Sequence, residues 1–331
     1  MKKTLQTTVL IGLIGSSLFC HSLLAQDLKA ADSDKIAKDM KGADAKFDTT
    51  KLWTVGSLLN INFSQVYLNN WLAGGQNAMT LTSISSSFAN YKKGNVTWKN
   101  SLELGYGITK LKDINARKSD DRLILISNYS IGKSPKLKYS ALVDFRTQFA
   151  AGYAYTIDKA TNKEVETYIS DFLAPGYLIG GLGIDYIPNK YMNFFISPFT
   201  YKGTFVANDY LSSIGAFGVK KGSRMRSELG AFMSAKFNMD VMKNINFKSN
   251  LNLFSNYSHF TKVDVMWENL LSMKVNKWIV VTFSNQLFYD DDVRILSPNE
   301  SAVAVVGEDA PGSPKVQYKQ VLNVGLSFIL R

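Results

Sequence analysis

Long runs of alternating apolar and polar residues constrain this chain more than any other feature of its sequence. From Leu229 to Met239 every second residue is apolar, and polar residues such as Lys236 and Asn238 lie between them. Three similar runs follow before residue 290. Alternation with period two is typical of a strand with one apolar and one polar face. The runs exceed the about five or six residues of an ordinary globular strand and the about 9–11 residues that a tilted strand needs to cross a membrane.

The same alternation extends through most of the chain and predicts about twelve strands. These are 58–68, 79–91, 96–112, 122–130, 137–151, 176–187, 191–207, four runs between 226 and 289, and 316–331. The predicted fold class is all-β, an antiparallel transmembrane β-barrel of about twelve strands, with ten or fourteen strands as alternative counts. In a soluble barrel that binds a ligand inside, the apolar face would point inward instead.

The connections between the predicted strands alternate between short and long, which is an independent indication of a membrane barrel. Short turns are expected on the periplasmic side and longer loops on the outer side. The short connections are 92–95, 131–136, 188–190, 242–246 and 276–277. The longest of the others are 113–121, 152–175, 208–225 and 294–315. This order places the N-terminus on the periplasmic side and the chain in the outer membrane of a cell.

The first residues are typical of a secretory signal peptide. Lys2 and Lys3 precede an apolar stretch, and Ala25 provides a small residue for cleavage. We therefore divide the chain into a signal peptide (1–25), a periplasmic N-terminal arm (26–52) and an outer-membrane barrel (53–331). Two alternatives remain: a lipoprotein signal using Cys20, although the bulky Phe19 precedes it, and an arm that plugs the barrel. Since Cys20 is the one cysteine, the mature chain is expected to form no disulfide.

One predicted outer connection carries an unusual cluster of Asn, Trp and Gly. The residues of this outer-loop motif are Asn69, Asn70, Trp71, Gly74, Gly75, Gln76 and Asn77. Together with the downstream segment 98–107, the motif resembles a family of outer-membrane proteins of Bacteroidota that is catalogued as a domain of unknown function. The resemblance is expected over most of the mature chain. It implies an outer-membrane barrel and carries over no catalytic or binding residues. By itself, the Gly-Gly step favours a loop folded over the barrel mouth, and contact of Trp71 with a solute is the alternative.

The charge of the chain favours contact with lipids and anions over contact with nucleic acid. The formal net charge is +11, but the Lys and Arg residues are scattered among turns and polar strand faces. A nucleic-acid-binding chain would gather them on one element. Expected partners are outer-membrane lipids and lipopolysaccharide, the barrel-assembly machinery during insertion, and other envelope proteins.

The polar faces of the strands predict what lines the lumen. Alternation directs eight charged residues inward as candidate lumen-lining residues: Lys99, Glu103, Asp144, Arg146, Glu228, Lys236, Glu268 and Lys274. With about twelve strands, the lumen is intermediate between filled eight-stranded barrels and open porins. These charges then either line a narrow channel or cross-link the interior. We accordingly predict a non-enzymatic channel or transporter for small polar or anionic solutes. The alternative is a structural or accessory subunit with a closed lumen.

Evidence for catalysis or for a cofactor is weak in this sequence. His259 is the one histidine outside the predicted signal peptide, and Asp264 or the run 290–292 would have to reach it across strands. A lipid-active barrel enzyme is therefore a remote alternative. The same acidic run lacks the spacing of a calcium-binding loop and is expected to be a solvated rim. No catalytic residue, metal site or cofactor is predicted.

Overall fold

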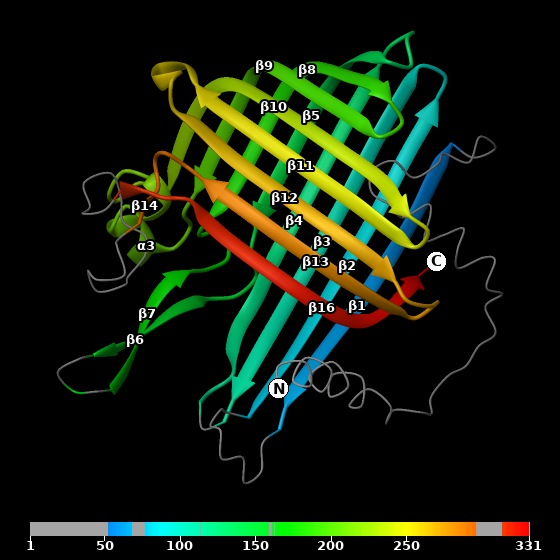
Figure 1. The fold of residues 1–331 in the computed structure, drawn as a ribbon. Coiled ribbons are helices and arrows are strands. Elements are labelled where there is room, and N and C mark those ends of the chain that lie inside the picture. Colours follow the sequence, from blue (N-terminus) through cyan, green and yellow to red (C-terminus); the bar gives the residue numbers. More distant parts are fainter. Residues whose placement is uncertain are drawn as a thin grey trace, which may run out of the picture.

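The chain forms a closed antiparallel β-barrel of twelve strands (Figure 1). The structure, a computed structural model, describes residues 52–67, 77–112, 114–158, 161, 163–295 and 313–330. Around the barrel the strands follow the order β1-β16-β13-β12-β11-β10-β9-β8-β5-β4-β3-β2. The barrel strands are β1 (Trp53–Val66), β2 (Ala78–Lys93), β3 (Val96–Leu111), β4 (Arg117–Ile131), β5 (Leu137–Thr147), β8 (Gly176–Asn189), β9 (Met192–Phe205), β10 (Met225–Met242), β11 (Ile245–Asn256), β12 (Val263–Lys274), β13 (Ile279–Tyr289) and β16 (Gln317–Leu330). The predicted fold class and strand count are confirmed.

The long connections contain secondary structure that the sequence pattern did not predict. They hold a hairpin of β6 (Gly152–Asp158) and β7 (Lys163–Ser170), the helix α3 (Asp209–Ser213), the 3-10 turns η2 (Ala216–Gly218) and η3 (Tyr257–His259), and the short pair β14 (Arg294–Ile295) and β15 (Ser313–Pro314). All of them lie at one end of the barrel, and the short turns lie at the other (Figure 1). We call these the loop end and the turn end.

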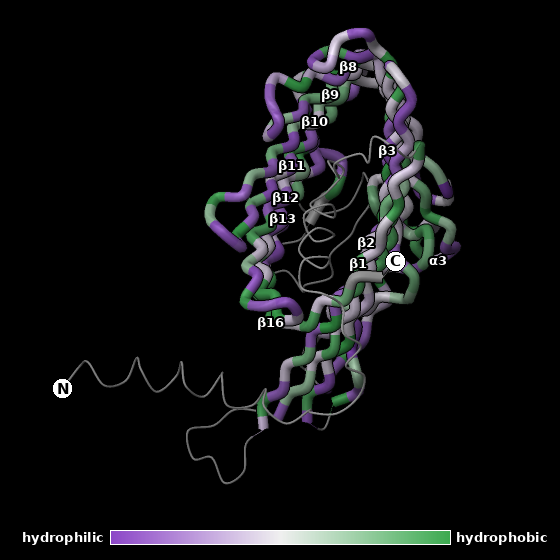
Figure 2. The backbone as a smooth tube through the Cα atoms, turned by 90° about the vertical axis from the view of Figure 1, so that its right-hand side faces the viewer, coloured by the Kyte–Doolittle hydropathy of each residue, from purple (hydrophilic) through white to green (hydrophobic). Residues whose placement is uncertain are grey.

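The outer surface of the barrel is apolar. Large side chains on the outward faces are strongly exposed, for example Leu182 at 64%, Phe199 at 74%, Leu229 at 65% and Leu322 at 65%. Along each strand hydrophilic and hydrophobic residues alternate (Figure 2). Water-soluble monomers rarely expose apolar surface on this scale, so the surface is suited to contact with lipid. No helix in the described part of the chain is both long and apolar enough to span a membrane.

Aromatic side chains gather at the turn end. The ring of Trp53 lies 5.2 Å from that of Tyr91 and 5.7 Å from that of Trp98, and the ring of Trp278 lies 6.2 Å from that of Phe328. Trp and Tyr prefer the amphipathic layer between lipid tails and water. This cluster therefore marks one boundary of the membrane-embedded zone.

An irregularity in β9 explains how a proline is accommodated within the sheet. The register shifts around Pro198 against both neighbours, between Leu182 and Ile184 on β8 and between Gly230 and Phe232 on β10. Proline donates no backbone hydrogen bond, and a bulge lets the pairing skip that position. The bulge brings the carbonyl of Ile196 so close to β8 that a side chain at Gly183 would meet it at 2.1 Å.

We expect Gly183→Ala to destabilise the barrel by about 1–3 kcal/mol, because the added methyl group forces the backbone apart at the bulge. Gly180 lies on the same strand, and a methyl group added there would have no neighbouring atom within 4 Å, so Gly180→Ala is the matched control. The measurement is the temperature at which each variant loses its compact, fast-migrating form in SDS gels. Equal transition temperatures for the two variants would contradict the close approach.

A cationic lumen

A large cavity occupies the interior of the barrel. Its volume is about 1570 Å³, and it is lined by inward-facing residues of all twelve barrel strands. Eleven Lys and Arg residues line it, against five Asp and Glu residues. The basic residues are Lys92, Lys99, Arg122, Lys138, Arg146, Lys236, Lys243, Lys248, Lys274, Lys277 and Lys319. Most of them lie towards the turn end, so this part of the lumen is electropositive.

Six of the eight residues expected to line the lumen are among the residues that line this cavity. They are Lys99, Glu103, Arg146, Lys236, Glu268 and Lys274. The other two, Asp144 and Glu228, are also on inward faces but are buried under ion pairs beside the cavity. Which of these side chains contacts a solute remains a prediction.

An ion pair bridges the barrel interior between β5 and β12. Arg146 donates two hydrogen bonds to Asp144, at 2.9 and 3.0 Å, and one to Glu268 at 3.4 Å. Gln286 on β13 donates to the second oxygen of Glu268 at 2.9 Å. In barrel order β5 and β12 are separated by four strands, so the bridge crosses the lumen. The cavity described above lies on one side of this bridge, and a packed part of the interior lies on the other, beside β8 to β11.

The packed part contains apolar residues on inward faces. Leu142, Phe195, Phe232 and Phe254 are buried against one another, and Ile126 and Ile179 pack at their edge. The rings of Phe195 and Phe232 are 6.2 Å apart. The alternation of the sequence did not predict this cluster, although each of these side chains lies on the same strand face as its polar neighbours at i±2. The cluster narrows the lumen on the side of β8 to β11.

A network of buried charges lies above the apolar cluster, nearer the loop end. The Lys202 network consists of Lys202, Arg226, Glu228, Asp264, Asp290 and Asp292. The ammonium group of Lys202 lies 2.5 Å from Asp264, 3.1 Å from Asp290 and 3.7 Å from Glu228. Lys202 is only 6% exposed. Together with the apolar cluster, this network fills the interior beside β8 to β11 towards the loop end.

Arg226 extends the network to the loop after β13. Its guanidinium group lies 2.9 Å from Glu228 and 3.0 Å from Asp292. Burial raises the pKa of Asp292, and the positive charge of Arg226 opposes that shift. Since Asp290 is 2% exposed and ion-paired, the expectation of a solvated acidic rim is wrong for this residue, whereas Asp291 and Asp292 are partly exposed and each paired with a basic residue. No group of three or more His, Cys, Asp or Glu residues that could hold a metal ion occurs among the described residues.

His259 lies on η3 at the loop end and is exposed. Of its potential carboxylate partners, Asp264 is bound to Lys202, and Asp291 lies 2.6 Å from Lys262 and accepts a bond from Tyr289. These carboxylates are therefore engaged in ion pairs rather than arranged around the imidazole. The geometry gives no support to the remote enzymatic alternative.

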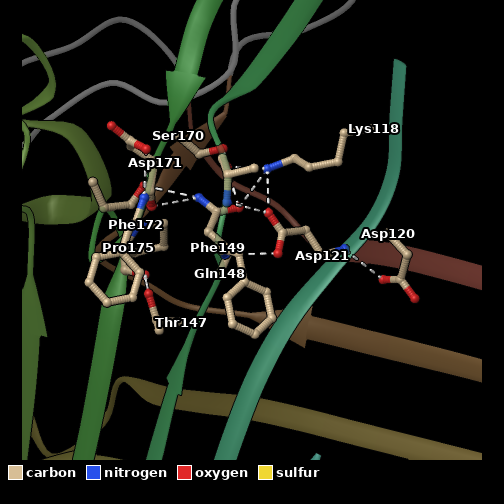
Figure 3. A network of polar contacts seen from close by, with 12 residues as sticks. Lys118, Asp120, Asp121, Thr147, Gln148, Phe149, Ser170, Asp171, Phe172 and Pro175 are labelled. Carbon is tan, nitrogen blue, oxygen red and sulfur yellow. Dashed lines mark hydrogen bonds and ion pairs between the residues drawn. The ribbon is translucent and has the colours of Figure 1, made fainter. Parts of the chain in front are cut away.

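Polar contacts hold the β6–β7 hairpin against the rim of the barrel (Figure 3). Asp121 accepts the backbone N–H groups of Phe149 at 2.8 Å and Ala150 at 2.9 Å, and the ammonium group of Lys118 at 3.0 Å. Gln148 donates to the carbonyl of Asp171 at 3.0 Å. Residues 148–150 belong to the predicted strand 137–151, but they make these bonds instead of continuing the strand. This explains why β5 ends at Thr147.

The rim also contains a coupled Tyr–Asp pair. Tyr168 on β7 donates to Asp171 at 2.5 Å. The hydrogen bond from Tyr168 lowers the pKa of Asp171, and partial burial together with that carboxylate raises the pKa of Tyr168. The Tyr168 ring packs against a small buried cluster around α3 that includes Leu211 and Phe217. The loops over β8 to β10 thus form a packed cap.

On the opposite side of the lumen a long-range ion pair links the walls. Lys319 on β16 lies 2.9 Å from Asp120 on β4, which also pairs with Arg122 at 3.0 Å. Arg122 in turn lies 3.1 Å from Glu103. All four residues line the cavity, so the lumen extends to this part of the barrel.

Of the outer-loop motif, Asn69 to Gln76 lie outside the described residues. Asn77 is described, and its backbone carbonyl accepts a hydrogen bond from the N–H of Lys112 at 2.8 Å. The predicted signal peptide and nearly all of the N-terminal arm also lie outside the described part. Their roles remain predictions.

A closed antiparallel barrel with an apolar outer surface and a polar interior is the architecture of outer-membrane β-barrels. Residues 63–153 match the model of a family described as protein of unknown function (DUF3078). Both segments that carry the resemblance lie inside this range, although the match covers less of the chain than the resemblance suggested. A search of curated proteins finds no match.

Several solved outer-membrane barrels are similar in outline to this chain. The NanC porin is 11% identical with a TM-score of 0.35, over 82% of this chain and 98% of the porin. The translocator domain of the autotransporter NalP from Neisseria meningitidis is 10% identical with a TM-score of 0.37, over 90% and 96%. An outer membrane channel from Pseudomonas putida F1 is 11% identical with a TM-score of 0.35, over 86% and 100%. Because these identities and TM-scores are low, the assignment of the fold is based on the strand pairing within this chain.

Proposed function

We propose that this chain is a non-enzymatic outer-membrane channel or transporter for small polar solutes with a preference for anions. The observation that carries the proposal is the excess of eleven basic over five acidic residues along one continuous cavity. Fixed charges of one sign raise the local concentration of the opposite ion and favour its passage. The apolar outer surface supports insertion in lipid.

We also propose the following environment for the barrel. Residues 1–25 direct export and residues 26–52 remain in the periplasm, at the turn end. Lipopolysaccharide, the barrel-assembly machinery and other envelope proteins are its proposed contacts. A structural or accessory role with a closed lumen is the second candidate, and the Lys202 network and the apolar cluster beneath β8 to β11 favour it.

Planar-bilayer recording of the purified protein tests the channel. We expect steady ohmic steps, and under a gradient of potassium chloride we expect a reversal potential that favours chloride. Arg146→Ala should reduce that preference and Glu103→Ala should increase it, because both side chains line the cavity. A correctly folded, heat-modifiable barrel without conductance would support the closed lumen instead.

A further inference from the structure

The closure of the barrel between its first and last strands is incomplete. β1 pairs with β2 along its whole length, but it pairs with β16 only from Ser57 to Asn62. On the other strand, β16 pairs with β13 from Gln317 onward and with β1 only from Gly325. Within the described part of the chain, Phe63–Val66 and Gln317–Val324 therefore face each other across the seam without a ladder. We call this stretch the open seam.

Exposure of the side chains agrees with the pairing. Along β5 and the first part of β10, more and less exposed residues alternate, because one face points outward and the other inward. At the open seam both faces are exposed, over residues 63–66 of β1 and 317–320 of β16. Figure 1 shows the ends of β1 and β16 near the loop end separating from each other.

The open seam lies at the depth of the membrane on the β16 side. Leu322 and Val324 are outward-facing and strongly exposed, as expected of residues in contact with lipid tails. Unpaired backbone N–H and C=O groups are costly in hydrocarbon and occur there only where they line a water-filled cavity or are buried in protein. The unpaired edges thus indicate a polar opening in the side wall.

The cavity extends to this opening. Asn62 on β1 and Lys319 on β16 both line it and both border the open seam. The lining near the seam combines cations with apolar side chains on inward faces: Leu58, Ile84, Val280 and Val321. The opposite wall is blocked by the Lys202 network and the capping loops. From the turn end, the cavity therefore reaches the side of the barrel at the open seam.

We propose that the open seam is a lateral port through which a single-chain amphiphile with an anionic headgroup moves between the membrane and the cavity. The apolar lining accommodates its tail, and Lys319 and the basic residues deeper inside attract its headgroup. Lys319 also forms an ion pair with Asp120 on β4, inside the barrel. The inference rests on the proposed use of the cavity as a passage, and it narrows the solute class from small polar anions to amphiphilic ones.

A disulfide across the seam tests the port. Continuing the register beyond the Asn62–Gly325 pair brings Ser64 opposite Asn323, so Ser64→Cys with Asn323→Cys closes the port when oxidised. Asn60→Cys with Ser327→Cys links residues that are already paired and is the matched control. Both pairs are built in the full chain with Cys20→Ser, and gel mobility before and after reduction reports bond formation.

The probe is a fluorescent lysophosphatidic acid added to proteoliposomes, and albumin extraction measures how fast it leaves the outer leaflet. We expect the oxidised Ser64–Asn323 variant to transfer the probe at least about tenfold more slowly than its reduced form, with no such difference for the control. Equal rates in the oxidised and reduced forms would overturn the port. Chloride conductance of the reduced protein is recorded separately. Its absence would count against the proposed channel alone, whereas redox-insensitive lipid transfer counts against the port alone.

A second measurement does not depend on disulfide formation. A bimane label at Val321→Cys, beside the seam, is compared with one at Ser234→Cys on the closed wall, since both positions line the cavity. Nitroxide-labelled lysophosphatidic acid should quench the label at residue 321 and leave the label at residue 234 unaffected. Equal quenching at the two positions would exclude entry through the seam.

Discussion

Replacing Lys202 with methionine is expected to lower the free energy of unfolding by about 3–5 kcal/mol, because it leaves buried carboxylates without their cation. The ammonium group lies within 3.1 Å of both Asp264 and Asp290, and Asp290 is 2% exposed. Carboxylates held in such an environment repel each other and have lost their hydration. Urea unfolding of the barrel in phospholipid vesicles, followed by tryptophan fluorescence, measures the change.

Two further variants make this prediction specific. Lys133→Met removes a lysine from an exposed turn and should leave the unfolding free energy unchanged within about 0.5 kcal/mol. Adding Asp264→Asn and Asp290→Asn to Lys202→Met should recover most of the loss, since the uncompensated charges are removed together with the cation. If Lys202→Met alone unfolds like the wild type, the network does not stabilise the barrel.

The second large effect is expected for ion selectivity. Converting Lys236, Lys248 and Lys274 to glutamate leaves eight basic and eight acidic residues on the lining, in place of eleven and five. We expect the anion preference to disappear, because the fixed charges then balance within about a Debye length of the permeating ion. The reversal potential under a gradient of potassium chloride measures this directly.

Lys110→Glu is the control for the selectivity experiment. This residue lies on β3 but is exposed and does not line the cavity, so the substitution changes the protein charge without changing the lumen. Its reversal potential should equal that of the wild type. If the triple variant keeps its anion preference while remaining heat-modifiable, ions do not pass these lysines, and the proposed path is wrong.

Much of the fold could be predicted from the sequence because the relevant pattern is local. Each strand shows its own two faces by alternation, and each turn is short or long independently of the others. Twelve strands, their order and their antiparallel pairing follow from these features. The inward direction of Lys99, Glu103 and Arg146 follows from the same alternation, and all three line the cavity.

The packing of the interior could not be predicted in this way, because it depends on which residues meet across the barrel. Lys202 and Asp290 are 88 positions apart and come together only when β9 and the end of β13 close on the same side of the lumen. The inward-facing Phe195, Phe232 and Phe254 pack into one cluster for the same reason. Local periodicity predicts the face of each residue and leaves its partners open.

Local pattern therefore specifies the strands, their two faces and the order of short and long connections. Where the lumen is blocked and where the wall is open depends on tertiary contacts. Closure of a barrel is governed by the stagger between its first and last strands, β1 and β16, which are joined by no turn that would set their register. That stagger leaves Gln317–Val324 without a partner across the seam in the described part of the chain, and it directs the cavity towards the side of the barrel.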